Sequence, residues 1–523
     1  MPEPEGSLRY ASTPGRWVLV ATIIGSGVAS LDATVVNVAL PTIGKHFGAG
    51  VSGLQWVITG YLISLSALIL LGGRLGDLFG RKRVFLAGVV WFTVASFLSG
   101  AALNLPMLIA SRALQGVGGA LLVPGSLAII ESSFVPEDRG RAIGAWAGLG
   151  GIATAIGPFV GGWLVSAVSW RLIFFLNVPL SVGVLLASRH VPESTDPTAD
   201  RHVDLLGAGL VIVGLAGVTF ALIEAPSPGE LAVVWIIGVV GVLGLVGFVA
   251  TERHIRHPML PPSIFGSRQF TAANLVTFVV YAALSGLLFL LAVDLQGALR
   301  FSPAAAGGAL FPVTVIMLLL SSRAGDLSQR IGPRIPMTVG PLVVGAGLLL
   351  MVRISPGGHY VTDVLPAVIV FGLGLSLTVA PLTATVLAAA DVNLAGIASG
   401  VNNAVARAAG LLAVAVLPAL AGITGASYTH PAALSAGFHT AVYISAAVTF
   451  SGAVIAFFGI RNPAPAMGAV GAEAAGAGAE AVGVGAEAGS GVSGVGPGSV
   501  TPAVGTEMCC PVDGPPLRRP RVG

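Results

Sequence analysis

Two residues of opposite charge lie inside long apolar stretches of the sequence, where an unpaired charge is costly. Asp32 lies fifteen residues beyond Trp17 in the first apolar stretch. Arg112 lies six residues after Pro106 in the fourth. If these stretches are membrane helices of opposite direction, a rise of about 1.5 Å per residue places Asp32 roughly 12 Å and Arg112 roughly 9 Å from one membrane surface. The spacing therefore predicts a carboxylate and a guanidinium at a similar depth.

A carboxylate at this depth can exchange a proton when its neighbours change. Burial disfavours the charged form of Asp32, whereas a nearby guanidinium favours it, so movement relative to Arg112 would bind or release a proton. We therefore predict that Asp32 is the proton-responsive carboxylate and that Arg112 is its partner. The alternatives are a permanently paired, structural aspartate and an arginine that reaches from a helix end toward the membrane surface.

Polar residues elsewhere in the apolar stretches are candidates for a substrate cavity. Gln115 follows Arg112 by three residues and therefore shares its helix face. Asn403 and Arg407, four residues apart, also share a face, and Arg407 either lines the cavity or ties its helix to a neighbour. Asp294 lies near the end of its stretch and is expected to be solvated. The residues assigned to the cavity are Asn37, Gln115, Asn403 and Arg407.

A charged loop with regularly spaced glycines follows the second apolar stretch. Gly73, Gly76 and Gly80 permit a tight turn and a close approach of helix ends. Asp77 lies in this loop among four basic residues. A weaker copy of the loop, containing Asp326, follows the tenth apolar stretch. The recurrence predicts an internal duplication of six helices; the alternative is a charged loop that serves only membrane topology.

The fifth apolar stretch combines a proline with closely spaced glycines. Pro158 removes a backbone donor and bends a helix. Gly157, Gly161 and Gly162 let a neighbouring helix approach closely. Taken alone, this pattern indicates tight packing and no particular activity.

The composition excludes a soluble protein. Apolar residues make up 54% of the 523 residues, charged residues 9%, and the mean hydropathy is +0.90, whereas soluble domains carry about 25% charged residues. The net charge of +3 gives no reason to expect nucleic-acid binding, and neither of the lysines lies in a phosphate-binding loop. The cysteines, Cys509 and Cys510, are adjacent, so we expect neither a disulfide framework nor a metal site.

Fourteen apolar stretches are long enough to span a hydrocarbon core, which is about 30 Å thick. With the N-terminus in the cytoplasm, most basic residues fall on the cytoplasmic side, and the outer segments carry only Lys45, Arg171, Arg300 and Arg353. We therefore expect an all-α polytopic membrane protein with both termini in the cytoplasm. The expected spans are 17–40, 53–72, 84–103, 106–130, 142–166, 170–188, 205–224, 231–251, 270–292, 303–321, 335–354, 362–386, 398–422 and 438–460.

The duplication divides these spans into two six-helix halves with two inserted helices. A Gly-Ala-Glu-Ala sequence recurs beyond the last span without large apolar side chains, which predicts a disordered tail. The expected segments are a cytoplasmic N-terminus over 1–16, an N-terminal half over 17–188, inserted helices over 205–251, a C-terminal half over 270–460 and a low-complexity cytoplasmic tail over 462–523.

Together these motifs resemble the fourteen-helix drug:proton antiporters of the major facilitator superfamily. The charged loop is similar to the superfamily's Gly-x-Leu-x-Asp-x-x-Gly-Arg-Lys pattern, with Leu78 where an arginine is usual. The sequences around Asp32 and Arg112 and the Gly-Pro-x-x-Gly-Gly sequence also match, and the resemblance covers residues 8–461. It implies a conformational latch between the halves, formed by Gly73, Asp77, Gly80, Arg81, Lys82 and Asp326, and an exporter motif formed by Gly157, Pro158, Gly161 and Gly162.

The resemblance implies export of amphiphilic drugs or antibiotics by alternating access, driven by the proton-motive force without a cofactor. Few acidic residues lie within the spans, which favours neutral, zwitterionic or singly charged substrates. The alternative is a proton-coupled symporter that takes up a small organic nutrient, which the motif in the fifth stretch disfavours. We expect a monomer in the cytoplasmic membrane, with substrate, protons and the lipid bilayer as partners, and no enzymatic activity.

Overall fold

The computed structural model describes residues 8–196, 203–226, 231–255, 258–389, 395–425 and 430–462. Within these ranges the chain is helical, without a β-strand beyond one isolated bridge between Leu8 and Phe134. Fourteen helices are long and apolar enough to span a membrane. The predicted all-α fold and number of spans are therefore confirmed. The predicted tail over 462–523 lies outside the described residues from residue 463 onward.

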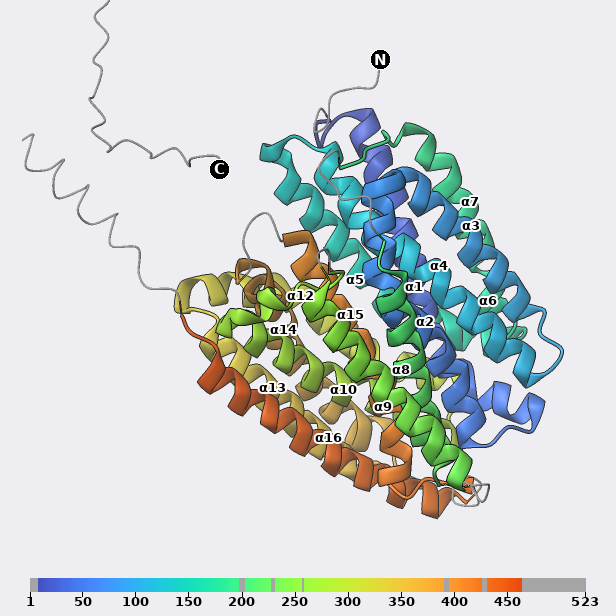
Figure 1. Ribbon diagram of the computed structural model, residues 1–523. Coiled ribbons are helices and arrows are strands. Elements are labelled where there is room, and N and C mark those ends of the chain that lie inside the picture. The colour runs from blue at the N-terminus through green and yellow to red at the C-terminus, as the bar shows by residue number, and fades with distance from the viewer. Residues whose placement is uncertain are drawn as a thin grey trace, which may run out of the picture. The chain divides into compact units, whose positions relative to one another are not determined.

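The N-terminal half, α1 to η1, is a bundle centred on α1 and α4 (Figure 1). Helix α4 packs against α1, α2 and α3, and α1 also packs against α5 and α7. The sixth predicted span is interrupted at Leu176, because Pro179 cannot donate a hydrogen bond to the carbonyl of Phe175. The elements are α1 (Thr13–Phe47), α2 (Val51–Phe79), α3 (Arg81–Gly100), α4 (Leu105–Ser133), α5 (Pro136–Ala167), α6 (Leu172–Phe175), α7 (Asn177–Ala187) and η1 (Ser188–His190).

The C-terminal half, η2 to α16, has α10 packed against α15 and α16, and α14 packed against α12 and α13. The tenth predicted span is divided at Leu310, because Pro312 cannot donate a hydrogen bond to the carbonyl of Gly308. The elements are η2 (Pro262–Gly266), α10 (Arg268–Gly297), α11 (Pro303–Ala309), α12 (Phe311–Ile331), α13 (Arg334–Leu350), η3 (Met351–Arg353), η4 (Tyr360–Val364), α14 (Leu365–Ala388), α15 (Ala395–Leu420) and α16 (Pro431–Gly459).

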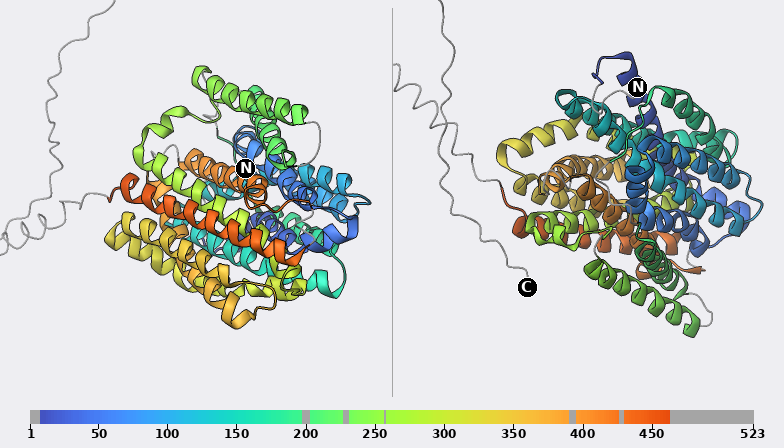
Figure 2. Two further views of the ribbon diagram at one scale, coloured as in Figure 1. Left: turned by 90° about the horizontal axis from the view of Figure 1, so that it is seen from below. Right: turned by 45° about the horizontal axis from the view of Figure 1, so that its top comes forward.

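The two inserted helices, α8 (Leu205–Glu224) and α9 (Leu231–His254), form a pair at the periphery of the bundle (Figure 2). A Cβ added to Gly217 would lie 2.8 Å from the Cα of Gly241, so glycines let the two backbones touch. Helix α8 packs against α2 and α15, and Trp56 of α2 donates a hydrogen bond of 2.9 Å to Glu224. The inserted pair is therefore anchored to both halves through α8.

The two halves contact each other at the far end of the bundle, which we define as the end where α1 terminates. Gln55 of α2 donates hydrogen bonds to the carbonyls of Val414 and Ala415 of α15, at 2.8 and 2.9 Å. Gln296 of α10 donates to the carbonyl of Val38 of α1 at 2.9 Å. One donor from each half therefore reaches the backbone of the other half.

The near end, where α1 begins, is more open along α5. Five glycines in the near portion of α5 have no atom of the structure within 4 Å of an added Cβ. They are Gly140, Gly144, Gly148, Gly150 and Gly151. In contrast, Gly162 at the far end of α5 lies against Pro303 and Ala304 of the other half. The halves are therefore in contact beside far α5, whereas these glycines of near α5 face open space.

Candidate functional site

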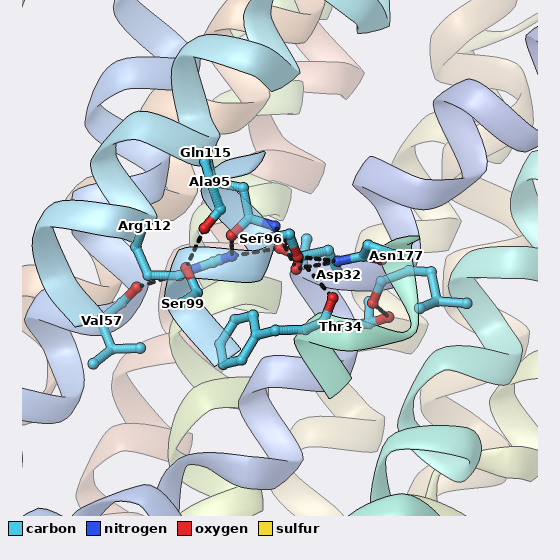
Figure 3. Close-up of polar contacts among 12 residues, drawn as sticks. Asp32, Thr34, Val57, Ala95, Ser96, Ser99, Arg112, Gln115 and Asn177 are labelled. Atoms are coloured by element: carbon cyan, nitrogen blue, oxygen red, sulfur yellow. Dashed lines mark hydrogen bonds and ion pairs between the residues drawn. The ribbon is translucent and has the colours of Figure 1, made fainter. Parts of the chain in front are cut away.

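Asp32 of α1 is fully buried and accepts hydrogen bonds from three side chains of other helices (Figure 3). Arg112 of α4 donates from Nη1 to Oδ2 at 2.5 Å and forms an ion pair with the carboxylate. Gln115 of α4 and Asn177 of α7 donate to Oδ1 at 2.9 and 3.1 Å. The structure thus brings together the two charged residues whose depth the sequence predicted to be similar.

The guanidinium of Arg112 is compensated on several sides, which explains how a charge with 1% exposure is tolerated within a span. Besides Asp32, Nη1 donates to Oε1 of Gln115 at 2.6 Å, and Nε donates to the carbonyl of Val57 at 3.3 Å. The guanidinium carbon lies 4.4 Å from the ring centre of Tyr61 and 5.7 Å from that of Phe174. Aromatic faces attract cations at these separations, so four elements hold the arginine in place.

Ser96 of α3 and Asn177 of α7 form a second polar layer behind Asp32. Asn177 donates to Oγ of Ser96 at 2.8 Å, and Ser96 donates to the carbonyl of Phe174 at 2.9 Å. Sequence reasoning missed both residues. A signal was present for Asn177, which is an amide inside an otherwise apolar predicted span and stands two residues before the proline that interrupts it.

Gln115, which was assigned to the substrate cavity, is instead fully buried. Its amide nitrogen donates to Asp32 and to Ser96, and its amide oxygen accepts from Arg112. Both ends of the amide are therefore occupied inside the network, and Gln115 orients the ion pair rather than presenting a free surface. This placement corrects the prediction from the sequence.

The other residues assigned to the cavity are partly exposed. Among the described residues, Asn37 and Asn403 donate only to carbonyls one turn earlier in their own helices, at 3.3 and 3.1 Å. Arg407 is also partly exposed on α15. The neighbouring Asn402 ties α15 to α10 by hydrogen bonds to Asn274 and Thr277, at 3.1 and 2.7 Å. Asn37, Asn403 and Arg407 thus keep polar atoms available to a ligand.

Asp294 of α10 differs from its predicted solvated position, because its residue exposure is 0%. Among the described residues, neither carboxylate oxygen has a hydrogen-bond partner. Spacing along the chain gives a residue's depth, but the rotation of α10 decides which way the residue faces. Here that rotation buries Asp294 in the helix packing.

The Gly-Pro-x-x-Gly-Gly motif of α5 packs directly against the helix that carries Asp32. Pro158 cannot donate a hydrogen bond to the carbonyl of Thr154, and Thr34 of α1 donates to that carbonyl at 3.2 Å. An added Cβ on Gly157 would meet Thr34 Oγ1, and one on Gly161 would lie 2.6 Å from Cγ1 of Val35. The glycines therefore allow the contact through which α1 satisfies the carbonyl that the proline leaves free.

The predicted charged loop is, in the structure, the end of α2 and the start of α3, with Gly80 alone between the helices. It is held by the segment that follows the sixth span. Asp77 forms an ion pair with Arg81 at 3.0 Å, and the Arg81 amide donates to the carbonyl of Ser194 at 2.9 Å. The Lys82 amide donates to Oε1 of Glu193 at 3.0 Å. These contacts lie within the N-terminal half, whereas Asp326 is exposed on α12. A latch between the halves is not made in this conformation and stays a proposal.

Gly80 ends α2 with φ of +109°, and an added Cβ would lie 2.6 Å from Oε1 of Glu193. Gly80→Ala is therefore expected to lower the free energy of unfolding by about 1–3 kcal/mol through backbone strain. Gly76→Ala is the matched control, because its added Cβ would meet nothing closer than 3.8 Å. Thermal unfolding of both variants in detergent checks the prediction, and equal stability of the two would contradict it.

Comparisons with known proteins identify the family of the chain. A family model of the Major Facilitator Superfamily matches residues 22–414. The chain is 35% identical to the puromycin resistance protein of Streptomyces alboniger, over 80% of this chain and 85% of that protein. It is 32% identical to the tetracenomycin C resistance and export protein of Streptomyces glaucescens, over 80% of this chain and 77% of that protein. It is 34% identical to the probable actinorhodin transporter of Streptomyces coelicolor, over 77% of this chain and 72% of that protein.

A solved structure with the same fold is that of a bacterial homologue of the human lysosomal transporter Spinster, in an inward-facing and unoccupied conformation. The TM-score is 0.60 at 15% identity, and the match covers 87% of this chain and all of that one. The helical fold, the family match and the sequence relatives agree with one another. The chain belongs to the Major Facilitator Superfamily and is a multi-pass membrane transporter, not an enzyme.

Proposed function

We propose that this transporter is a proton-coupled antiporter that exports amphiphilic drugs or antibiotics by alternating access. The names of its relatives support export of antibiotics. The observation that carries proton coupling is the buried pair of Asp32 and Arg112, whose carboxylate is held by three donors from two other helices. A neutral Asp32 would release Arg112 from its counter-charge, so protonation and helix position are linked.

The proposal places the near end of the bundle in the cytoplasm. The helix ends and turns at the near end carry many basic residues, and the far end carries few, as the positive-inside bias predicts. Among the described residues, those at the near end are Arg9, Arg16, Arg74, Arg81, Lys82, Arg83, Arg139, Arg141, Arg189, Arg253, Arg268, Arg323, Arg330, Arg334 and Arg461, and those at the far end are Lys45, Arg171, Arg300 and Arg353. Both termini would then be cytoplasmic, in a monomer of the cytoplasmic membrane that opens toward the cytoplasm beside α5.

The driving force would be adequate for efflux. One proton moving inward releases about 2.3 kcal/mol per 100 mV of membrane potential. Since 1.4 kcal/mol corresponds to a tenfold ratio, one proton sustains a substrate gradient of some tens-fold per 100 mV. The central site opens alternately to each side of the membrane as the two halves rock about it.

Proton flux in inverted membrane vesicles tests the proposal. A pH-sensitive dye follows an imposed proton gradient while a panel of amphiphilic antibiotics is added. We expect some compounds to dissipate the gradient in the wild type and not in Asp32→Asn, because the amide cannot carry a proton. Glu137→Gln, an exposed acidic residue at the start of α5, is the matched control and should behave as the wild type.

Two other results would contradict parts of the proposed function. Gradient dissipation that survives in Asp32→Asn would remove the coupling role from Asp32. Proton movement in the same direction as a nutrient, in vesicles of the opposite orientation, would establish symport instead of antiport.

A further inference from the structure

Arg407 lies midway along the face of α15 that contacts α2. An added Cβ on Gly400 would lie 3.1 Å from Leu70 of α2, and the carbonyl of Val414 accepts a hydrogen bond from Gln55 of α2. Gly400 and Val414 are seven residues before and after Arg407, and a spacing of seven residues returns to the same helix face. The Arg407 side chain therefore leaves α15 on the side that faces the N-terminal half.

Two tyrosines from different halves lie within electrostatic range of Arg407. They are Tyr61 of α2 and Tyr281 of α10. The ring of Tyr61 also lies 4.4 Å from the guanidinium of Arg112. Tyr61 contacts Arg112 and lies on α2, the helix against which the Arg407 face of α15 packs, so Arg407 and the Asp32 network flank the same helix.

The two arginines differ in how their charge is balanced. Arg112 has 1% exposure and is paired with a carboxylate, whereas Arg407 is partly exposed. In the part of the chain that the structure describes, Arg407 forms no ion pair, unlike Arg81, Arg83 and Arg112. A guanidinium at this depth is costly unless it faces water or a counter-charge, so an unpaired, partly exposed one lines a hydrated cavity.

The charges in the middle of the bundle do not cancel. Among the described residues of the span centres, the charged side chains are Asp32, Arg112 and Arg407. Asp32 balances Arg112, and Arg407 leaves one positive charge. Protonation of Asp32 would raise the excess to two. A ligand that complements this site therefore carries negative charge.

We propose that Arg407 binds the anionic group of the substrate, so that the transporter selects amphiphiles with one carboxylate or ionised phenol over cationic ones. This inference rests on the export proposed above and names its substrate class. A guanidinium fits a carboxylate with two parallel hydrogen bonds. Arg407 would thus be a specificity-determining residue.

Two dyes with one xanthene skeleton and opposite charge test the inference. Fluorescein is anionic and rhodamine 123 is cationic, and both are offered to energised inverted vesicles that contain the transporter. Vesicles are collected by filtration and the dye is extracted at one fixed pH, so that the internal pH does not affect the reading. We expect gradient-dependent accumulation of fluorescein and at least tenfold less accumulation of rhodamine 123.

Variants at Arg407 connect the selectivity to this side chain. Arg407→Gln should raise the half-saturating fluorescein concentration at least tenfold, and Arg407→Lys should restore most of the affinity, because the charge returns. Arg323→Gln, an exposed arginine of α12, is the matched control and should not change it. Equal thermal stability of the variants in detergent would separate a loss of binding from a loss of folding.

The outcomes distinguish the inference from the function on which it rests. Gradient-dependent accumulation of rhodamine 123 in preference to fluorescein would overturn the anionic class and leave export standing. An unchanged fluorescein affinity in Arg407→Gln would remove Arg407 from the binding site. Accumulation of neither dye in energised vesicles would count against export itself.

Discussion

Replacing Arg112 with leucine is expected to abolish gradient-driven transport and to lower the free energy of unfolding by about 3–5 kcal/mol. The carboxylate of Asp32 would lose its counter-charge while its exposure stays at 0%, and an unpaired buried charge is the costliest outcome of breaking a pair. Two acceptors would lose a donor as well, Oε1 of Gln115 and the carbonyl of Val57. Thermal unfolding in detergent and proton flux in vesicles measure the two effects.

A double variant separates the charge effect from the loss of packing. Asp32→Asn combined with Arg112→Leu removes the unpaired carboxylate, so part of the lost stability should return while transport stays absent. The coupling energy between the two positions then follows from a double-mutant cycle. Arg323→Leu is the matched control for loss of an arginine, because this side chain is exposed on α12. Stability that is equal in Arg112→Leu and the control would show that the pair is not needed for folding.

Gly162→Ala is expected to reduce transport about 10- to 100-fold without unfolding the protein. The added Cβ would meet the carbonyl oxygen of Pro303 and lie 2.9 Å from the Cα of Ala304, both in the other half. Overpacking of this kind costs about 1–3 kcal/mol, and the cost falls only on the conformation in which the far ends are closed. The variant should therefore shift the population toward far-end opening.

The matched control is Gly151→Ala in the same helix, where an added Cβ meets no atom within 4 Å. The shift is read with Val38→Cys, a buried far-end position, after both natural cysteines, Cys509 and Cys510, are replaced by serine. A membrane-impermeant maleimide added at the far side should label Val38→Cys faster with Gly162→Ala than with Gly151→Ala. Equal labelling and equal transport in the two would exclude steric control by Gly162.

The sequence predicts the parts of this structure that depend on depth in the membrane. Apolar length determines the fourteen spans, and helical rise alone gives Asp32 and Arg112 a similar depth, where the structure joins them. Rotation about the helix axis is a different quantity, and most spans are apolar on every side. The sequence therefore could not distinguish Gln115 inside the network from a cavity residue, or show that Asp294 is buried.

Partners that come from irregular segments were also beyond prediction. Glu193 and Ser194, which hold the charged loop, lie in a polar stretch without helical periodicity. Asn177, which donates to Asp32, is the first residue of α7, directly after the interruption of the sixth span. Proline explains that break after the fact, but a proline in an apolar span does not by itself specify which side chain turns inward.

The hydrogen bonds that join the halves at the far end have a consequence for how the transporter responds to its medium. Gln55 and Gln296 are uncharged. The carbonyl of Val414, which accepts from Gln55, is the one that Pro418 leaves without a helical donor. In the ranges that the structure describes, no ion pair crosses between the halves. Screening by salt acts on charges, so ionic strength outside the cell should leave the resting conformation largely unchanged. Each neutral hydrogen bond stabilises the conformation with closed far ends by about 0.5–1.5 kcal/mol. This stabilisation is small enough for the binding of one ligand to overcome.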